Sequence, residues 1–343
     1  MDGPRHVPPS DAPRAPPVQP ADEGDEDADA IAPDEAPERR TGIVAASLHG
    51  VRLDRAVVAL APEFSRSHLQ GLIARGHVRL DGAVADAAAR KVRAGQAIDV
   101  ELVATAESRA FRPEAIALAV VYEDDDLLVI DKPAGLVVHP AAGNWQGTLL
   151  NGLLARDAKA AMLPRAGIVH RLDKDTSGLL LVGRTLLAVN ALSRAIAARE
   201  VHRSYLAIAH GEWPQALTQI DAPIARDPRS RVRMAIVASG RAARTDVERV
   251  ASASLDGARL SALRCTLHTG RTHQIRVHLA ARGHPLVGDA LYGGTAALGV
   301  QRQALHAARL VLAHPRSGEA LAFDAPLPAD LAQAWQRVVN ATA

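Results

Sequence analysis

The sequence contains little cysteine and no long apolar run, and each shortage excludes a class of protein. Cys265 is the only cysteine among 343 residues, which excludes an internal disulfide, a cysteine-based zinc site and a two-thiol redox centre. No apolar run approaches the roughly 18 to 20 residues that span a bilayer. The acidic, proline-bearing start lacks the basic and then apolar layout of a signal peptide. We therefore expect a cytoplasmic protein that contacts no membrane.

Fingerprints of nucleotide-dependent enzymes and of serine hydrolases are also absent. The chain contains no phosphate-binding loop and no dinucleotide-binding glycine motif. Ser177 lacks the G-x-S-x-G turn that exposes a serine nucleophile. We therefore expect no nucleotide cofactor and no serine-hydrolase chemistry.

Charge is unevenly distributed along the chain. Residues 1–40 contain eleven acidic residues, four arginines and nine prolines, with almost no large apolar side chains. Such a segment cannot bury enough surface to offset the entropy lost on ordering, so it is predicted to be a disordered acidic tail. Residues 41–343 retain 36 basic and 27 acidic residues, a net charge of +9. A basic body favours a phosphate-bearing partner such as nucleic acid.

Residues 41–104 are predicted to form a small domain of two helices and short strands. Apolar residues at helical spacing indicate a helix near 53–60 and a second helix that ends at Gly76. The stretches 77–82 and 97–102 are typical of short strands. Basic and polar residues near the helix starts and the last strand are suited to holding an RNA backbone, although an ordinary solvated surface is the alternative. These residues are Arg52, Arg55, Ser65, Arg66, Lys91 and Arg93.

The remainder of the chain, residues 105–343, shows mostly strand signals and one clear helix. A fully apolar run at 179–182 is typical of a buried strand, and the apolar stripe at 186–196 indicates the helix. The pattern predicts an α+β fold that is rich in sheet. Further strands are expected at 118–122, 127–130, 204–209 and 260–267.

Two polar clusters are candidates for the functional site. The sequence H-R-L-D-K-D-T-S-G at 170–178 lies between apolar strands, where so many polar groups are costly to desolvate, which favours binding or catalysis over a merely capped structural loop. The second cluster is H-T-G-R-T-H-Q-I-R-V-H at 268–278. Its histidines are five residues apart, so neither a strand nor a helix converges them on one metal ion. Its arginines suit a carboxylate or a phosphate.

Four motifs resemble those of the RluA-type pseudouridine synthases and occur in the same order. They are D-K-P-A-G-L-V-V-H-P at 131–140, the nonamer at 170–178, S-Y-L-A-I-A-H-G at 204–211 and G-R-T-H-Q-I-R-V-H at 270–278. The region before them is similar to a small S4-like RNA-binding domain. Within the family the match is closest to the RluD branch, through P-R-A-G-I-V-H before the nonamer and H-P-L-V-G-D-A-L-Y-G-G at 284–294, although the connection from Gly294 to Arg302 is shorter than is common there.

The resemblance implies a fold, a reaction and a partner. We expect an S4-like domain followed by a catalytic domain with a mixed, mainly antiparallel sheet. The reaction detaches uracil from C1′ at N1 and rejoins it through C5, with no metal or cofactor. The expected substrate is a stem-loop of 23S ribosomal RNA in a precursor large subunit, and the protein is expected to be a monomer. A non-catalytic ribosome-assembly factor, or a synthase for another RNA or another 23S site, is the alternative.

The resemblance also assigns roles to residues. It makes Asp173 the catalytic aspartate, Tyr205 the tyrosine near the target base and Arg276 the cation paired with Asp173. Arg171 matches the arginine that enters the RNA stack when the target uridine leaves it. Whether Asp173 attacks C1′ or removes the proton at the 2′ carbon stays open. Further residues expected to bind RNA are His170, Arg271, His273 and Gln274.

Overall fold

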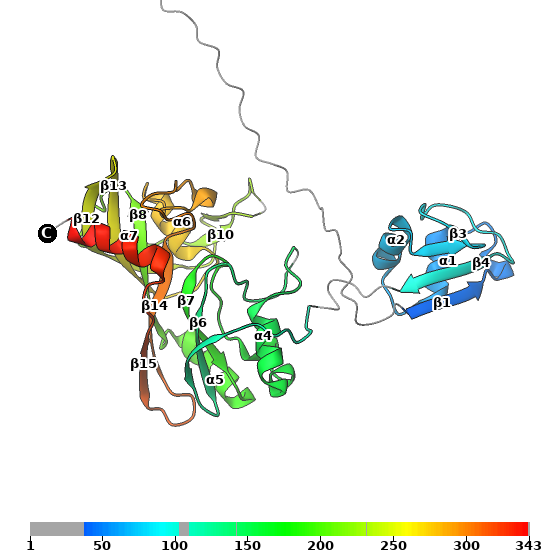
Figure 1. The fold of residues 1–343 in the computed structure, drawn as a ribbon, viewed down its shortest axis with the longest axis horizontal. Helices are drawn as coiled ribbons and strands as arrows, with labels where there is room; N and C mark the ends of the chain where they lie inside the picture. Colours follow the sequence, from blue (N-terminus) through cyan, green and yellow to red (C-terminus); the bar gives the residue numbers. More distant parts are fainter. Residues whose placement is uncertain (1–37, 103–109, 142, 231, 342–343) are drawn as a thin grey trace, which may run out of the picture. The chain divides into compact units, whose positions relative to one another are not determined.

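The computed structural model describes residues 38–102, 110–141, 143–230 and 232–341. The chain divides into two compact units, Met1–Val103 and Ala104–Ala343 (Figure 1). The domain boundary predicted at residue 104 lies outside the described residues. Among the described residues, no helix combines the length and the apolar character needed to cross a membrane.

The smaller unit contains a four-stranded antiparallel sheet, in the order β1-β4-β2-β3, and two helices. Both predicted helices are present, and their buried side chains pack with those of the sheet in one apolar core. Asp81 and Gly82 both have positive φ angles, +52° and +81°, as the tight turn of a hairpin requires. The elements are β1 Glu38–Ile43, α1 Leu53–Leu60, α2 Arg66–Ala74, β2 Val78–Leu80, β3 Ala83–Val84 and β4 Ala97–Leu102.

Strand β1 corrects one boundary of the sequence analysis. The predicted tail, residues 1–40, includes the first three residues of this strand. They belong to the strand because β1 pairs along its whole length with β4, from Glu38 opposite Leu102 to Ile43 opposite Ala97. Composition does not reveal this pairing, since the partner strand lies at the other end of the unit in the sequence. The rest of the predicted tail lies outside the described residues.

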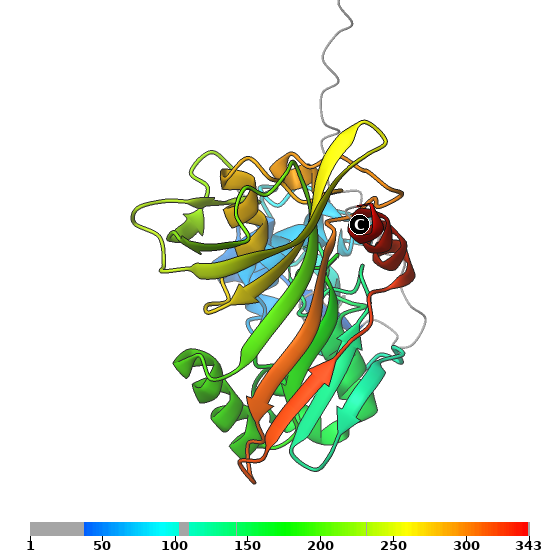
Figure 2. The same cartoon turned by 90° about the vertical axis from the view of Figure 1, so that its left-hand side faces the viewer.

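The larger unit is built on a nine-stranded sheet whose main path is β5-β6-β7-β14-β8-β13-β12-β9, with β15 paired to β14. In the part of the sheet that the structure describes, only the β7–β14 pair is parallel, so the predicted mixed and mainly antiparallel sheet is confirmed. Strands β8, β14 and β15 run side by side in Figure 2. The strands are β5 Ala119–Glu123, β6 Leu127–Lys132, β7 Ser177–Gly183, β8 His202–His210, β9 Leu217–Asp221, β12 Arg244–Leu255, β13 Ala258–Leu267, β14 Leu305–Ala313 and β15 Ala320–Asp324, and a separate hairpin joins β10 Ile224–Arg226 to β11 Met234–Ile236.

Helices cover both faces of the sheet. Alternate residues of β7 point to opposite faces, so Leu180 packs in the core with α4, while Leu179 and Leu181 pack in the core with α5. This two-sided burial explains the uninterrupted apolar run of β7, and the predicted α+β class is confirmed. The helices are α4 Leu149–Arg156, α5 Leu186–Ala198, α6 Gln274–Ala281 and α7 Ala329–Asn340.

Gly178 allows strands β7 and β14 to run as close parallel neighbours. It lies opposite Ala307 in the register and has a φ angle of +109°. A Cβ atom at Gly178 would lie 2.3 Å from the carbonyl oxygen of Ala307, far inside normal contact distance. The sheet itself therefore requires the last glycine of H-R-L-D-K-D-T-S-G.

Replacing Gly178 with alanine is expected to lower the free energy of unfolding by about 3 kcal/mol, because the added Cβ forces β14 away from β7. Gly257→Ala is the matched control. Gly257 also has a positive φ angle, but nothing lies within 4 Å of its added Cβ, so we expect a loss of only about 1 kcal/mol. Urea unfolding followed by circular dichroism measures both losses, and equal losses would contradict the steric explanation.

Candidate active site

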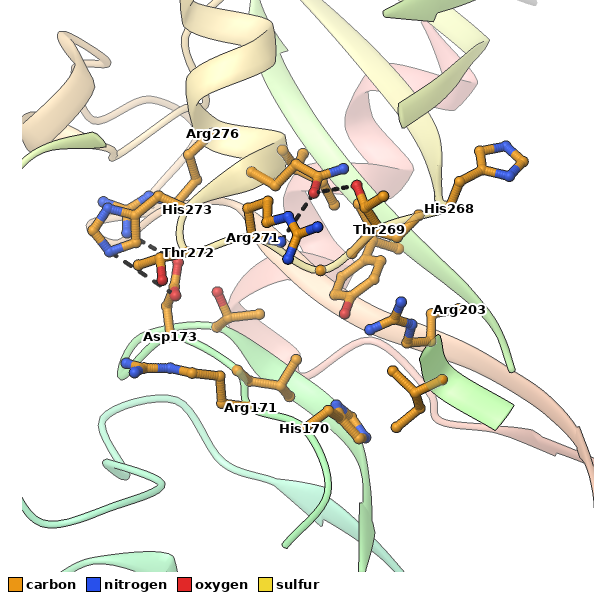
Figure 3. Close-up of a pocket in the computed structure, with 18 of the residues that line it drawn as sticks. His170, Arg171, Asp173, Arg203, His268, Thr269, Arg271, Thr272, His273 and Arg276 are labelled. Atoms are coloured by element: carbon orange, nitrogen blue, oxygen red, sulfur yellow. Dashed lines mark hydrogen bonds and ion pairs between the residues drawn. The ribbon is translucent and has the colours of Figure 1, made fainter. Parts of the chain in front are cut away.

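All of the site residues predicted in the larger unit line one pocket of about 330 Å³ (Figure 3). Tyr205 on β8 lies opposite Cys265 on β13 and Ala307 on β14, and Ala307 lies opposite Gly178 on β7. The loop before β7 and the segment after β13 therefore meet beside Tyr205. The other predicted residues in the pocket are His170, Arg171, Asp173, Arg271, His273, Gln274 and Arg276.

Arg276 holds Asp173 through a chain of ion pairs. Nη1 of Arg276 donates to Oδ2 of Asp173 at 3.1 Å. On its other side, Nε and Nη2 of Arg276 donate to both oxygens of Asp289, at 2.8 and 2.9 Å. The side chains of Arg276 and Asp289 are only 7% and 1% exposed. Burial alone would lower the pKa of Arg276, but the two carboxylates outweigh burial and raise the pKa above its usual range.

His273 lies on the other side of Asp173 and is held by Tyr292. Nε2 of His273 is 3.9 Å from Oδ1 of Asp173. The Tyr292 hydroxyl accepts a hydrogen bond from the amide of Met234 at 2.9 Å and lies 2.8 Å from Nδ1 of His273. Burial lowers the pKa of His273, so its ring is neutral at neutral pH. If Tyr292 donates its proton to Nδ1, the N–H of His273 is at Nε2 and faces Asp173.

The Tyr292 ring also supports the cation of the site. The guanidinium carbon of Arg276 lies 5.0 Å from the centroid of this ring, within the range of a cation–π contact. Tyr292 thus contacts both side chains that flank Asp173, one through its ring and the other through its hydroxyl.

A buried lysine and a partly buried histidine fix the loop that carries Asp173. Nζ of Lys132 donates to three carbonyl oxygens, those of Pro133, Leu136 and Lys174, at 2.8 to 2.9 Å. Burial lowers the pKa of Lys132 to about 8. Nε2 of His170 accepts the amide hydrogen of Leu181 in β7 at 2.9 Å. Lys132 and His170 therefore tie the loop to its neighbouring segments and strand.

Both polar atoms of the Gln274 side-chain amide form hydrogen bonds within the protein. Oε1 accepts from the Thr269 hydroxyl and the Arg271 amide, and Nε2 donates to the carbonyl of Arg244 and the hydroxyl of Thr245. Its side chain is also buried. Gln274 was expected to bind RNA, but in this geometry it orders the turn that carries Arg271 and offers no free polar atom.

The three histidines of the 268–278 cluster have different partners. His268 pairs with Asp246 at 2.7 Å, whereas His278 contacts Thr245 at 2.9 Å and His273 contacts Tyr292. In the described ranges, no group of three or more histidine, cysteine or acidic side chains is placed to hold a metal ion.

Two further features shape the wall around Tyr205. Tyr205 is buried, and burial raises the pKa of its phenol. Arg203, two residues earlier on β8, is also buried and lines the same pocket, and its buried Nε atom has no hydrogen-bond partner in the described structure. The pocket therefore combines one carboxylate with several cations, an arrangement suited to an anionic polymer.

In the smaller unit, a buried carboxylate organises the predicted basic surface. Asp54, at the start of α1, is fully buried and accepts hydrogen bonds from Arg52, Arg66 and Gln70, at 3.2, 2.8 and 2.6 Å. Burial alone would raise the pKa of Asp54, but these donors outweigh it and lower the pKa well below its usual range. Sequence analysis did not identify Asp54.

The remaining predicted residues of the smaller unit have different surroundings. The backbone of Arg52 forms a β-bridge with that of Lys91, and Arg55 is exposed in the first turn of α1. Arg93 is exposed as well. Ser65 caps α2, since its Oγ accepts the amide hydrogen of His68 at 3.2 Å. The arginines and Lys91 are thus exposed to solvent, whereas Ser65 has a structural role.

Comparison with known proteins agrees with these motifs. Residues 126–281 match the family model described as RNA pseudouridylate synthase, and residues 51–98 match the S4 domain. The chain is 47% identical over 305 residues to "Ribosomal large subunit pseudouridine synthase D" of Nitrosomonas europaea, and the alignment covers 86% of each chain. The chain belongs to the RNA pseudouridylate synthase family.

Other relatives of this synthase show the same pattern. "Ribosomal large subunit pseudouridine synthase D" of Xanthomonas campestris is 47% identical over 318 residues, which cover 88% of the synthase and 92% of the relative. The solved structure of "Human RNA Pseudouridylate Synthase Domain Containing 1" is 28% identical, with a TM-score of 0.50, and the match covers 66% of the synthase and 86% of the human chain.

Sequence analysis of the synthase missed the residues that position Asp173 and Arg276. Asp289 and Tyr292 lie in H-P-L-V-G-D-A-L-Y-G-G at 284–294, and Lys132 lies in D-K-P-A-G-L-V-V-H-P. The motifs were therefore noticed, but linear spacing gave no sign that these side chains meet Arg276 or the loop around Asp173.

Tyr292→Phe is expected to lower kcat about tenfold with little change in KM, because the ring stays while the hydroxyl that orients His273 is lost. Steady-state kinetics on an RNA substrate measures both constants.

Tyr122→Phe is the matched control, since the Tyr122 hydroxyl also donates to a side chain, that of Asp124 at 2.6 Å, but Tyr122 lies outside the pocket. We expect wild-type constants for this variant. An equal fall in kcat in both variants would show that the effect of Tyr292 is not specific to the site.

Proposed function

We propose that this enzyme converts specific uridines of 23S ribosomal RNA to pseudouridine, with Asp173 as the catalytic residue. The synthase family is shown by the comparisons, and relatives with nearly half of their residues identical are named for the large ribosomal subunit. The observation that supports the role of Asp173 most strongly is its ion pair with the buried Arg276, in the pocket that also holds Tyr205.

The ion pair between Asp173 and Arg276 leaves one oxygen of Asp173 for the substrate. Oδ2 accepts the hydrogen bond from Arg276, whereas Oδ1 lies 3.9 Å from Nε2 of the neutral His273. In the reaction the N1–C1′ bond breaks, a C5–C1′ bond forms, and the C5 proton is replaced by one at N1, so no other reactant is consumed. We assign Oδ1 to the ribose, either as the nucleophile at C1′ or as the base at the 2′ carbon.

Tyr205 and Arg171 serve the base in this proposal. Burial keeps the phenol of Tyr205 neutral at physiological pH, so its ring serves as a wall beside uracil, and its oxygen can accept the C5 proton through a water molecule. Arg171 is exposed at the edge of the pocket, two residues before Asp173. A uridine inside a stem-loop must leave the stack to reach Asp173, and a planar guanidinium can occupy the vacated position.

The smaller unit supplies additional RNA affinity in this proposal. Its exposed basic residues around Asp54 contact the phosphate backbone, while the larger unit carries out the reaction. We further propose that the substrate is a stem-loop in a precursor of the large subunit, and that the enzyme acts as a monomer in the cytoplasm.

Asp173→Asn is expected to lower the rate of pseudouridine formation more than about a thousandfold without weakening RNA binding, because the amide keeps the shape but loses the charge and basicity of the carboxylate. Pseudouridine is mapped in ribosomal RNA from cells that lack the protein and from the same cells supplied with the wild type or the variant.

Asp175→Asn is the control for this experiment, since Asp175 lies in the same loop but does not line the pocket. It should restore the modification. Modification restored by Asp173→Asn would rule out the catalytic assignment, and an unchanged modification pattern in cells without the protein would rule out the proposed substrate.

The double variant Arg55→Gln, Lys91→Gln is expected to weaken RNA binding and to flatten its salt dependence. Each lost phosphate contact should reduce the slope of log affinity against log salt by about 0.7 to 0.9. Fluorescence anisotropy across a salt series measures the slope. Arg79→Gln, an exposed arginine of the same unit that bonds the Gly82 carbonyl, is the control and should leave the slope unchanged. An unchanged slope in the double variant would contradict phosphate binding by these residues.

A further inference from the structure

A second cavity, of about 390 Å³, adjoins the Asp173 pocket. The two share His170 and Arg171, so Arg171 borders both. The proposed function uses none of the other residues that line this second cavity. Its lining is Phe111, His139, Pro140, Leu150, Arg165, Ile168, His170 and Arg171.

Phe111 is an aromatic side chain held in an exposed position. It is 67% exposed, more than any other phenylalanine, tyrosine or tryptophan in the described ranges. Its backbone is fixed on both sides, because the buried side-chain amide of Asn151 donates to the carbonyls of Ala110 and Arg112, at 3.1 and 2.8 Å. An aromatic ring on a fixed backbone at the mouth of a cavity provides a platform on which a flat ligand such as a base can stack.

Arg165 is presented by a strained turn. Arg165 and Ala166 both have left-handed backbone angles, with φ of +53°, and Gly167 follows with +86°. A Cβ at Gly167 would lie 2.0 Å from the carbonyl oxygen of Gly183, so this position of the turn requires glycine. Consecutive left-handed residues other than glycine are costly and are found mainly where function requires them.

Two cations converge on the cavity without an acidic partner. In the described part of the chain, neither Arg165 nor Arg171 forms an ion pair, and both are exposed. Burial, and then the nearby charges of Arg165 and Arg171, lower the pKa of His139 to about 4, so its imidazole is neutral and adds no positive charge. The cavity therefore combines a fixed aromatic face, apolar walls and two unpaired guanidinium groups.

We propose that this cavity binds an RNA nucleotide that flanks the target uridine. The base lies against Phe111 and Pro140, and the phosphate lies between Arg165 and Arg171. An aromatic platform beside cations is the arrangement that binds unpaired nucleotides, since the ring replaces base stacking and the cations neutralise the phosphate. A simple anion would not need Phe111, and an uncharged apolar ligand would not need two arginines.

The position of Arg171 explains why the nucleotide should be a neighbour of the target. Extruding a uridine leaves the adjacent base with one unstacked face, and Phe111 offers a new surface for that base. Since Arg171 borders both cavities, a strand with one nucleotide at Asp173 would place the next in this cavity. The inference rests on the proposed function, because it requires that the substrate is RNA with its uridine at Asp173.

The test couples a protein change to an RNA change. The substrate is a fragment of ribosomal RNA that contains a uridine identified by the mapping experiment, prepared intact or with one abasic nucleotide on either side of that uridine. With the intact fragment, Phe111→Ala in the full-length enzyme should lower kcat/KM about tenfold, and Phe111→Tyr should keep most of the activity. An abasic nucleotide on one side should lower the wild-type value by a similar factor.

The decisive result is the combination of the two changes. If the missing base is the one that Phe111 contacts, Phe111→Ala should cause no further loss on that abasic fragment. Arg165→Gln should lower kcat/KM severalfold and flatten its salt dependence. Leu217→Ala and Arg337→Gln are matched controls, since Leu217 is similarly exposed and Arg337 pairs with Asp256 outside both cavities, and both should behave as wild type.

Several outcomes would overturn the inference. The first is a fall in kcat/KM from Phe111→Ala that is no larger than the fall from Leu217→Ala. The second is that Phe111→Ala lowers kcat/KM by the same factor on both abasic fragments as on the intact fragment. The third is a fall seen with ribosomal particles but not with the naked fragment, which would indicate a protein contact instead. In each case the wild type stays active and the proposed function stands. If the wild type modified no ribosomal RNA fragment, the proposed function would fail and this inference would fail with it.

Discussion

The buried guanidinium of Arg276 holds the loop of Asp173, helix α6 and the turn at Asp289 together. Asp173 and Arg276 are 103 residues apart in the sequence, so only the completed fold can join them. Taking one cation and two carboxylates out of water is costly, and the cost is offset only when nearly every hydrogen bond is made in good geometry. The requirement for complete pairing fixes the position of Asp173 before any RNA arrives, which favours catalysis by a preorganised site.

The large sheet makes that pairing geometrically feasible. Cys265, Tyr205, Ala307 and Gly178 lie in one row across four strands, and the segments that carry Asp173 and Arg276 leave the sheet beside this row. Each element of the site therefore derives its position from strand register. The close parallel contact of β7 with β14 sets the distance between the carboxylate loop and the tyrosine, and Lys132 and His170 hold the loop itself.

Local patterns in the sequence predicted much of this architecture, and distant contacts account for the rest. Helices α1, α2 and α5 and strands β6, β7, β8 and β13 follow apolar spacing that is visible within a short window. Strands β12 and β14 were not identified, since their residues become recognisable only through their partners in the sheet. Helices α4 and α7 were also not identified, although Leu331, Ala334 and Val338 of α7 lie at helical spacing. The first residues of β1 were assigned to the tail for the same reason, because their pairing with β4 cannot be read from composition.

The site shows the same division. The sequence motifs identified the predicted residues of the Asp173 pocket, but not the residues that position their side chains. The side chains of Asp54, Asp289 and Tyr292 form hydrogen bonds with side chains that are distant in the sequence. Such contacts produce no periodic pattern in the sequence. Gln274 shows the converse, since its motif marked it as a ligand for RNA, whereas its hydrogen bonds are all made within the protein.

Strand β7 is buried at every position and begins four residues after Asp173. A strand covered on both faces separates from its neighbours only when the sheet opens as a whole. The Asp173 loop is therefore anchored at its C-terminal end to an element that stays in place until the sheet opens. Under heat stress, this anchor would persist in every molecule whose larger unit remains folded. The extent of RNA modification would then follow the quantity of folded enzyme rather than a gradual decline in the quality of each molecule.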